Sequence, residues 1–245
     1  MIKNNLYISK TPEELAVHFG EQLMNWVANY SEKAFHLAIS GGKTPNLLFS
    51  VLAEKYAESP LWQKTHFWWV DERMVPPNHP ESNFGVANKL LFSQISIPEE
   101  NIHRIKGENT PEAEALSYSS QIQERLKQEN GWPVFDLILL GMGDDGHTAS
   151  IFPNQIKLFE STNVCAVAVH PESGQKRVTL TGKVLNNSIH VCFLVTGKTK
   201  ADRMAEITGK TKDGQRLPAF YVSNANENTQ WFLDQDAASK IGSTH

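Results

Sequence analysis

The sequence predicts a single α/β domain in which a doubly wound, mainly parallel sheet carries helices on both faces. Short apolar runs typical of buried strands alternate along the chain with segments whose apolar residues recur at helical spacing. The chain has 245 residues, of which 40% are hydrophobic, and no linker, repeat or low-complexity segment divides it. We therefore expect residues 1–245 to form one domain, with a loose tail at its end, IGSTH.

The first half of the chain carries clear start signals for its elements. The stretch Thr11-Pro12-Glu13-Glu14 is a capping box with proline at the first helical position, so it predicts a helix that continues to Tyr30. Apolar and β-prone runs predict the next strands at 34–40 and 66–70. Further helices are expected after residue 44, from about Ser82, and over 111–130.

The residue pattern in the second half of the chain predicts more strands than helices. Strands are expected at 135–140, 164–169, 178–181 and 189–196, and helices near Lys198 and around Asn228. In open parallel sheets, ligands bind beyond the carboxyl ends of the strands. The loops at these ends are therefore the places to look for chemistry.

The composition of the chain argues against binding to nucleic acid, membranes or metal ions. The formal net charge of −4 gives no electrostatic reason to expect nucleic acid or an anionic membrane. The opening MIKNNLYISK has no apolar signal core, and no apolar run reaches membrane-spanning length, so we expect a cytoplasmic protein. Cys165 and Cys192 lie in strand-like runs and are expected to be buried hydrophobes. The nine histidines form no metal-binding pattern, so no metal is expected.

The first strand-end loop is ISGGKTP. Gly41 and Gly42 allow a ligand to approach the backbone closely, and Thr44 is expected to cap the helix that follows. Free amides at a helix N-terminus, with Lys43 beside them, suit a phosphate group. An ordinary tight turn with a cap explains the same residues equally well.

The second loop is VDERMVPPNHPESN, over residues 70–83. Asp71, Glu72 and Arg73 directly follow an apolar strand, which places ionisable groups at the rim of the sheet. Such a loop fits a binding site, and it fits a solvated loop with a local ion pair equally well.

The third loop lies in FDLILLGMGDDGHTASIFP. Its glycines have the spacing of a dinucleotide-binding fingerprint, but Asp144 and Asp145 would repel a pyrophosphate. Asp145 and His147 instead suggest a carboxylate that orients an imidazole acting as a general base, with Gly146 permitting the turn between them. A capping aspartate with an incidental histidine is the alternative.

Cations follow further strands. Arg177 begins the strand at 178–181, and Lys198 and Lys200 follow the strand that ends at Thr196. Each alone fits ordinary surface charge, but together they offer a site for a phosphorylated sugar.

Five segments in order, SGGKTP, WVDERMVPPNHPESN, LLGMGDDGHTASIFP, RVTLT and VTGKTKA, resemble the 6-phosphogluconolactonases from about residue 37 to 222. That family is similar to glucosamine-6-phosphate deaminase/isomerase and shares its modified Rossmann fold. The resemblance implies hydrolysis of 6-phospho-D-glucono-1,5-lactone to 6-phosphogluconate in the oxidative pentose phosphate pathway. It implies no metal and no nicotinamide cofactor, and a sugar phosphate lactone as the ligand.

The resemblance also suggests roles for individual residues. His147 would be the general base, with Asp145 holding its ring, and Arg73 would stabilise the substrate or the oxyanion. Asp71 would bind a sugar hydroxyl or position Arg73. The expected phosphate site comprises Gly41, Gly42, Lys43, Thr44, Arg177 and Lys200.

Two alternatives stay open, a sugar-phosphate deaminase or isomerase of the same fold and a non-catalytic sugar-phosphate sensor. The deaminase branch has a glutamate five residues after the histidine of its DGH motif, where this chain has Phe152. Ser150 is expected one turn into a helix, where it caps or packs and is not a nucleophile. We expect a monomer or a small homo-oligomer.

Overall fold

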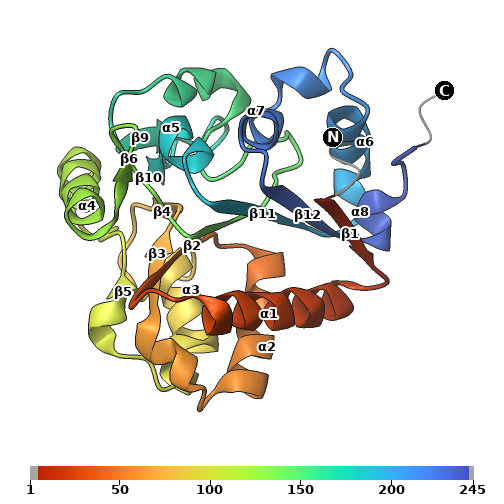
Figure 1. The fold of residues 1–245 in the computed structure, drawn as a ribbon. Coiled ribbons are helices and arrows are strands. Elements are labelled where there is room, and N and C mark those ends of the chain that lie inside the picture. The colour runs from red at the N-terminus through yellow and green to blue at the C-terminus, as the bar shows by residue number, and fades with distance from the viewer. Residues whose placement is uncertain (1–4, 243–245) are drawn as a thin grey trace.

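A computed structural model describes residues 5–242 of the chain, and its central feature is a seven-stranded sheet in which all neighbouring strands are parallel (Figure 1). This confirms the predicted fold class. The strands run in the order β1 (Leu6–Ser9), β12 (Thr229–Asp234), β11 (His190–Val195), β8 (Leu137–Leu140), β2 (Phe35–Ile39), β3 (Thr65–Trp69) and β5 (Ile102–His103).

The strand order reverses between β2 and β8. From β2 the chain builds outward through β3 to β5, and from β8 it builds in the opposite direction through β11 to β12. Neighbouring loops at such a reversal leave the sheet in opposite directions and open a crevice beyond the strand ends. The loops after β2 and β8 are the glycine-rich segments at Gly41 and Gly141.

A second, antiparallel sheet stands beside the first. It consists of β4 (Asp71–Arg73), β10 (Lys176–Leu180) and β9 (Cys165–Val169), in that order. The segment DER was expected to lie in a loop, but it is the edge strand β4. Val70 joins the two sheets, because its N–H donates to the carbonyl of Ile39 and its carbonyl accepts from the N–H of Leu180.

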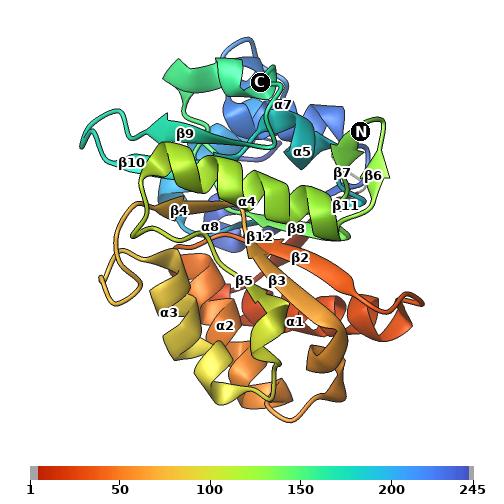
Figure 2. The same cartoon turned by 90° about the vertical axis from the view of Figure 1, so that its left-hand side faces the viewer.

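Helices cover both faces of the main sheet. Figure 1 shows α1, α2 and α3 on one side and α5, α6 and α7 on the other, and Figure 2 shows α4 crossing the small sheet, where it contacts β9 and β10. The α-helices are α1 (Pro12–Asn29), α2 (Lys43–Tyr56), α3 (Asn83–Leu90), α4 (Pro111–Arg125), α5 (Gly182–Asn186), α6 (Ala201–Thr208), α7 (Pro218–Ala225) and α8 (Gln235–Ala238).

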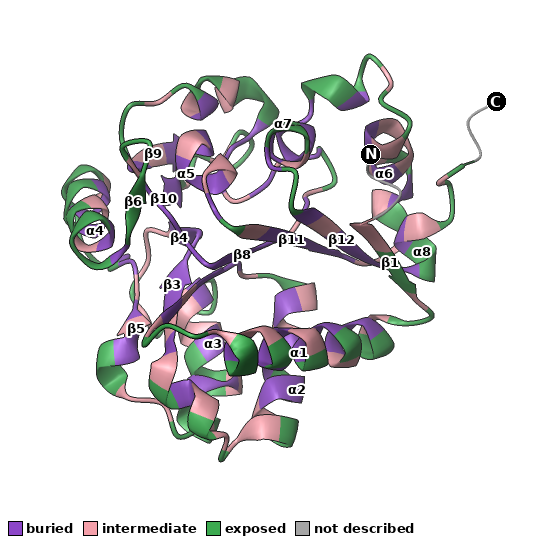
Figure 3. Ribbon diagram, viewed as in Figure 1, coloured by how far each residue is buried: buried purple, intermediate pink, exposed green. Residues whose placement is uncertain are grey.

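The core lies on both faces of the main sheet, which Figure 3 shows as buried along its central strands. Every residue of β8 is buried, as expected for a strand covered on both sides. Cys165 and Cys192 are buried and unpaired, which confirms the prediction from their apolar surroundings. Within residues 5–242, no helix combines the length and the apolar character needed to span a bilayer.

Several local predictions were confirmed. Thr11 caps α1 by accepting a hydrogen bond from the N–H of Glu14 at 3.2 Å, and Ser82 caps α3. The helix near Lys198 begins with a 3-10 turn, Lys198–Lys200, and continues as α6.

Two expectations about the elements were wrong. Helix α4 ends at Arg125 and not at residue 130, because the chain then forms the short hairpin of β6 (Gln128–Glu129) and β7 (Trp132–Pro133). The turn of this hairpin places Asn130 and Gly131 at positive φ. The helix expected around Asn228 is strand β12, and the edge strand β1 was not predicted. Of the expected tail, residues 243–245 lie outside the described residues.

Candidate active site

A cavity of about 570 Å³ lies beyond the carboxyl ends of β2, β8 and β11, beside β4 and β10. The structure brings the predicted site residues together there, although they come from loops far apart in the sequence. The predicted residues that line the cavity are Gly41, Gly42, Lys43, Thr44, Asp71, Arg73, His147, Arg177 and Lys200. Asp145 is the exception, because it lies beside His147 and contacts the cavity through it.

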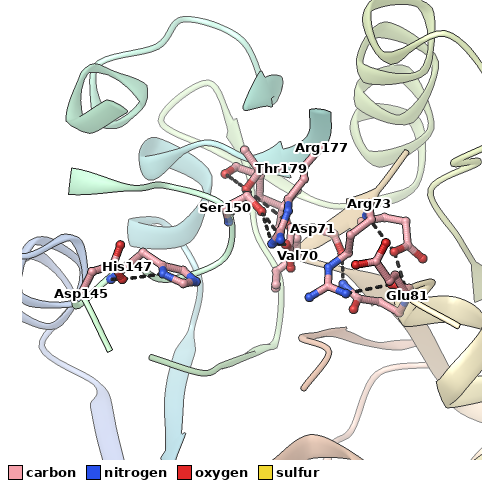
Figure 4. A network of polar contacts seen from close by, with 12 residues as sticks. Val70, Asp71, Arg73, Glu81, Asp145, His147, Ser150, Arg177 and Thr179 are labelled. Atoms are coloured by element: carbon pink, nitrogen blue, oxygen red, sulfur yellow. Dashed lines mark hydrogen bonds and ion pairs between the residues drawn. The ribbon is translucent and has the colours of Figure 1, made fainter. Parts of the chain in front are cut away.

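Asp145 and His147 form the hydrogen-bonded pair that the sequence suggested. The carboxylate Oδ1 of Asp145 accepts from His147 Nδ1 at 2.6 Å and also from the backbone N–H of His147 at 3.1 Å. In Figure 4 the imidazole ring points away from Asp145, toward the side of the site that holds Ser150 and Arg177. A ring that donates through Nδ1 keeps Nε2 free to accept a proton.

The ionisation of Asp145 reflects this pairing. Burial raises the pKa of Asp145, but its hydrogen bond to His147 and the charge of that imidazole lower it more, so the net shift is downward. Asp145 is therefore a carboxylate at neutral pH and can stabilise a protonated His147.

Two glycines allow the loop to fold this tightly. Gly146 adopts φ +79°, a left-handed conformation that other residues rarely adopt. Gly143 packs directly against the imidazole, and a Cβ placed on it would lie 2.1 Å from Nδ1 of His147. The spacing that resembled a nucleotide fingerprint therefore serves to position the histidine.

Across the cavity, Asp71 anchors a buried polar cluster. The hydroxyl of Ser150 donates to Asp71 Oδ2 at 2.6 Å, and Arg177 Nη1 lies 3.7 Å from the same oxygen. Ser150 was expected within a helix, but it lies in a turn between Thr148 and Ile151 and is fully buried. With its hydroxyl committed to a carboxylate, Ser150 positions Asp71.

Arg73 and Arg177 are cross-strand neighbours in the small sheet. Arg73 donates through Nη1 to the carbonyl of Glu81 at 2.8 Å, and the Nε atoms of both arginines are buried without a hydrogen-bond partner among the described residues. Two guanidinium groups side by side create a positive region that suits an anionic ligand or a developing negative charge.

Glu72 explains why the segments DER and HPESN belong together. Its buried carboxylate accepts hydrogen bonds from the backbone N–H groups of Asn83 and Phe84, each at 2.8 Å, and from the hydroxyl of Ser82 at 3.0 Å. These groups form the N-terminus of α3, so the helix dipole also favours the negative charge. Glu72 thus fixes β4 to α3 and holds its neighbours Asp71 and Arg73 in place.

The glycine-rich loop differs from the prediction in one respect. Gly42, at φ +115°, is the N-cap of α2, and no side chain caps this helix. Thr44 was expected to be the cap, but its hydroxyl lies 2.7 Å from that of Thr196 at the end of β11. The uncapped N-terminus of α2 lines the cavity together with the exposed side chain of Lys43.

Lys200 reaches the cavity as part of an ion pair. Its ammonium group lies 2.6 Å from Asp144 Oδ1, and hydrogen bonds from Lys200 and Thr199 lower the pKa of Asp144. The lysine therefore neutralises the aspartate whose charge argued against an anionic ligand at this loop.

Some residues of the site were not predicted. Asn83, Thr196 and Thr199 line the cavity without having been assigned a role. Asn83 is the last residue of HPESN, which follows DER in the segment WVDERMVPPNHPESN. Its place in that segment was the available signal. Thr196 and Thr199 carry no pattern that marks them from sequence.

The family profile of glucosamine-6-phosphate isomerases/6-phosphogluconolactonase matches residues 10–231. The chain belongs to this family. A 6-phosphogluconolactonase of Haemophilus influenzae is 47% identical over 203 residues, covering 82% of this chain and 85% of that protein. One of Aggregatibacter actinomycetemcomitans is 43% identical over 92% of this chain and 97% of that protein. The structure of 6-phosphogluconolactonase from Trypanosoma brucei matches with a TM-score of 0.87 and 26% identity, covering 97% of this chain and 98% of that one.

Phe152, the position at which the sequence differs from the deaminase branch, lies beside the predicted base. Its fully buried ring lies with its centroid 4.7 Å from that of His147, and the guanidinium of Arg177 lies 5.7 Å from its centre. A glutamate at this position, as in the deaminase branch, would lie beside the imidazole. Phenylalanine gives the histidine an apolar neighbour without a proton to exchange.

Proposed function

We infer that the chain hydrolyses 6-phospho-D-glucono-1,5-lactone to 6-phosphogluconate, a step of the oxidative pentose phosphate pathway. The observation that carries this conclusion is the Asp145–His147 pair facing a cation-rich cavity, in a chain 47% and 43% identical to proteins named 6-phosphogluconolactonase. A lactone is an activated ester, and such a site offers a base, an anion-binding region and room for a sugar phosphate.

In the proposed mechanism, Nε2 of His147 takes a proton from water as the oxygen attacks the lactone carbonyl. The electron pair of that carbonyl becomes an oxyanion, which Arg73 stabilises through its guanidinium. When the oxyanion collapses, the bond to the ring oxygen breaks and the imidazolium returns the proton to this leaving oxygen. Asp145 keeps the imidazole oriented and stabilises it while it is charged.

We propose that the phosphate group binds among the amides and cations that line the cavity. The uncapped N-terminus of α2 over Gly41–Thr44 offers amides, and Lys43, Arg177 and Lys200 offer charge. Asp71 keeps one carboxylate oxygen free of hydrogen bonds from the described residues, and we assign this oxygen to a sugar hydroxyl. A cytoplasmic location and a monomeric or small homo-oligomeric state stay predictions.

The test is hydrolysis of freshly generated lactone, followed by coupled oxidation of phosphogluconate with spontaneous hydrolysis subtracted. His147→Ala is expected to lower kcat about 10²–10⁴-fold, the usual contribution of general-base catalysis. His18→Ala is the matched control, because His18 is exposed on α1 and does not line the cavity.

The outcomes separate the alternatives. Full activity in His147→Ala would keep the reaction and reject the mechanism. No turnover by the wild-type chain would reject the lactonase, and ammonia release from glucosamine 6-phosphate would then test for a deaminase. Tight binding of phosphogluconate without turnover of either compound would indicate a sensor.

A further inference from the structure

Asn83 presents a single polar atom to the cavity. It is the first residue of α3, it is 5% exposed, and its side chain lies against the glycine-rich loop. A Cβ placed on Gly41 would lie 1.9 Å from Oδ1 of Asn83. The carboxamide oxygen therefore occupies the space beside residue 41 that any other side chain would fill.

The orientation of this carboxamide is fixed. Nδ2 of Asn83 donates to the backbone carbonyl of Asp71 at 2.9 Å, and a carbonyl partner can be satisfied only by the NH₂ group. The backbone N–H of Asn83 is held in turn by Glu72 Oε1 at 2.8 Å. Because Nδ2 and the backbone N–H of Asn83 are both engaged by other residues of the protein, Oδ1 is the atom left for a ligand.

Oδ1 of Asn83 accepts no hydrogen bond from any residue between 5 and 242, and it is not sealed from the cavity. A carboxamide oxygen that has no hydrogen to donate is unsuited to phosphate, because two oxygen acceptors repel each other. It suits a hydroxyl group, which can donate. Desolvation of such an acceptor without a partner is costly, so a ligand that satisfies it is favoured over one that does not.

We propose that Asn83 is a specificity-determining residue that accepts a hydrogen bond from one ring hydroxyl of the sugar lactone. This inference rests on the proposed function and assigns a contact within that site. The oxygen of Asn83 marks the border between the phosphate-binding part of the cavity and the part that receives the hydroxylated ring. The fixed amide favours binding of a lactone that carries this hydroxyl over binding of a lactone that lacks it.

The experiment compares kcat/KM for the parent lactone with values for its 2-, 3- and 4-deoxy analogues, each generated from the matching deoxyglucose 6-phosphate and followed by proton release. The wild-type chain should prefer the parent over one particular analogue by about tenfold, the effect of one hydrogen bond. Asn83→Ala should lose about tenfold on the parent and almost nothing on that analogue, so the preference disappears.

Ser82→Ala is the control, because it removes the cap of α3 and one hydrogen bond to Glu72 without changing a group that lines the cavity. It should lower thermal stability and leave the preference between lactones unchanged. Asn83→Ser is a second variant in case Asn83→Ala does not fold. Equal losses on the parent and all analogues would show a merely structural role and overturn the inference. Absence of wild-type turnover would overturn the proposed function and this inference with it.

Discussion

The imidazole of His147 lies against the backbone of Gly143, leaving no room for a side chain at residue 143, because a Cβ there would come within 2.1 Å of Nδ1. Gly143→Ala should therefore displace the imidazole from Asp145 and lower kcat by an amount approaching that of His147→Ala, about 10²-fold or more. The measurement is steady-state hydrolysis of the lactone, with far-UV circular dichroism to confirm folding.

Gly141→Ala is the matched control for this substitution. Residue 141 lies in the same loop and also lines the cavity, but a Cβ there meets no protein atom within 4 Å and its φ is not in the left-handed region. Its activity should stay close to that of the wild-type chain. Equal losses in both variants would show that the loop as a whole is sensitive and that contact with the histidine is not the cause.

Replacing Asp145 with asparagine tests the orienting carboxylate. Asp145→Asn keeps the size of the side chain but removes the charge that stabilises protonated His147, so kcat should fall about 10- to 150-fold, the equivalent of a hydrogen bond to a charged group. KM should change little, because Asp145 does not line the cavity. A rise in KM with unchanged kcat would instead place Asp145 in substrate binding.

The two lysines of the phosphate site should differ in importance. Lys200 is held in the cavity by Asp144, so Lys200→Met removes a positioned cation and leaves an unpaired carboxylate; KM should rise about 10- to 150-fold. Lys43 is exposed, with no ion-pair partner among the described residues, and Lys43→Met should raise KM less than about fivefold. The reverse order would contradict the assigned roles. Adding Asp144→Asn to Lys200→Met should restore part of the affinity by removing the repulsion.

A histidine cluster away from the active site predicts sensitivity to acid. His36, His66 and His103 lie on the neighbouring strands β2, β3 and β5, where His66 and His103 are joined by a ring-nitrogen contact of 3.0 Å and Trp68 donates to His36 at 3.1 Å. Burial, and then the nearby charge of His66, lower the pKa of His36 to about 4 and that of His103 to about 3. Burial also lowers the pKa of His66.

In the unfolded chain these histidines take up protons near pH 6.5, whereas the folded protein resists protonation until about pH 4. Stability from the neutral cluster is therefore present above about pH 6.5 and is lost as pH falls toward 4. The measurement is the free energy of unfolding in urea at pH 7, 6 and 5. Its slope against pH should be smaller in His103→Gln than in the wild-type chain, by up to about 1 kcal/mol per pH unit. An unchanged slope in His103→Gln would contradict the prediction.

The sequence was most informative where one local rule decides the structure. The cap at Thr11, the buried strand β8 and the Asp145–His147 pair follow from patterns within a few residues. It was least informative where tertiary contacts decide. Strand β1 exists because it pairs with β12, and residues around Asn228 join the sheet because β11 offers a parallel neighbour.

The same distinction applies to the site. That His147 and Arg73 share a cavity was inferred through resemblance, because no local pattern places residues so far apart in one pocket. The burial of Ser150 against Asp71, and the open acceptor of Asn83, depend on how β4 meets β10 and α3. The spacing of residues along the chain carries no information about such contacts between distant elements.

The pairing of β4 with β10 also has a consequence for how the protein folds. It joins residues 73 and 177, so a loop of about a hundred residues must close before the two arginines and Asp71 come together. Contacts this distant in sequence form slowly compared with helices or hairpins. In refolding from denaturant, helical structure should therefore return first and lactonase activity last. Recovery of activity would then mark the end of folding.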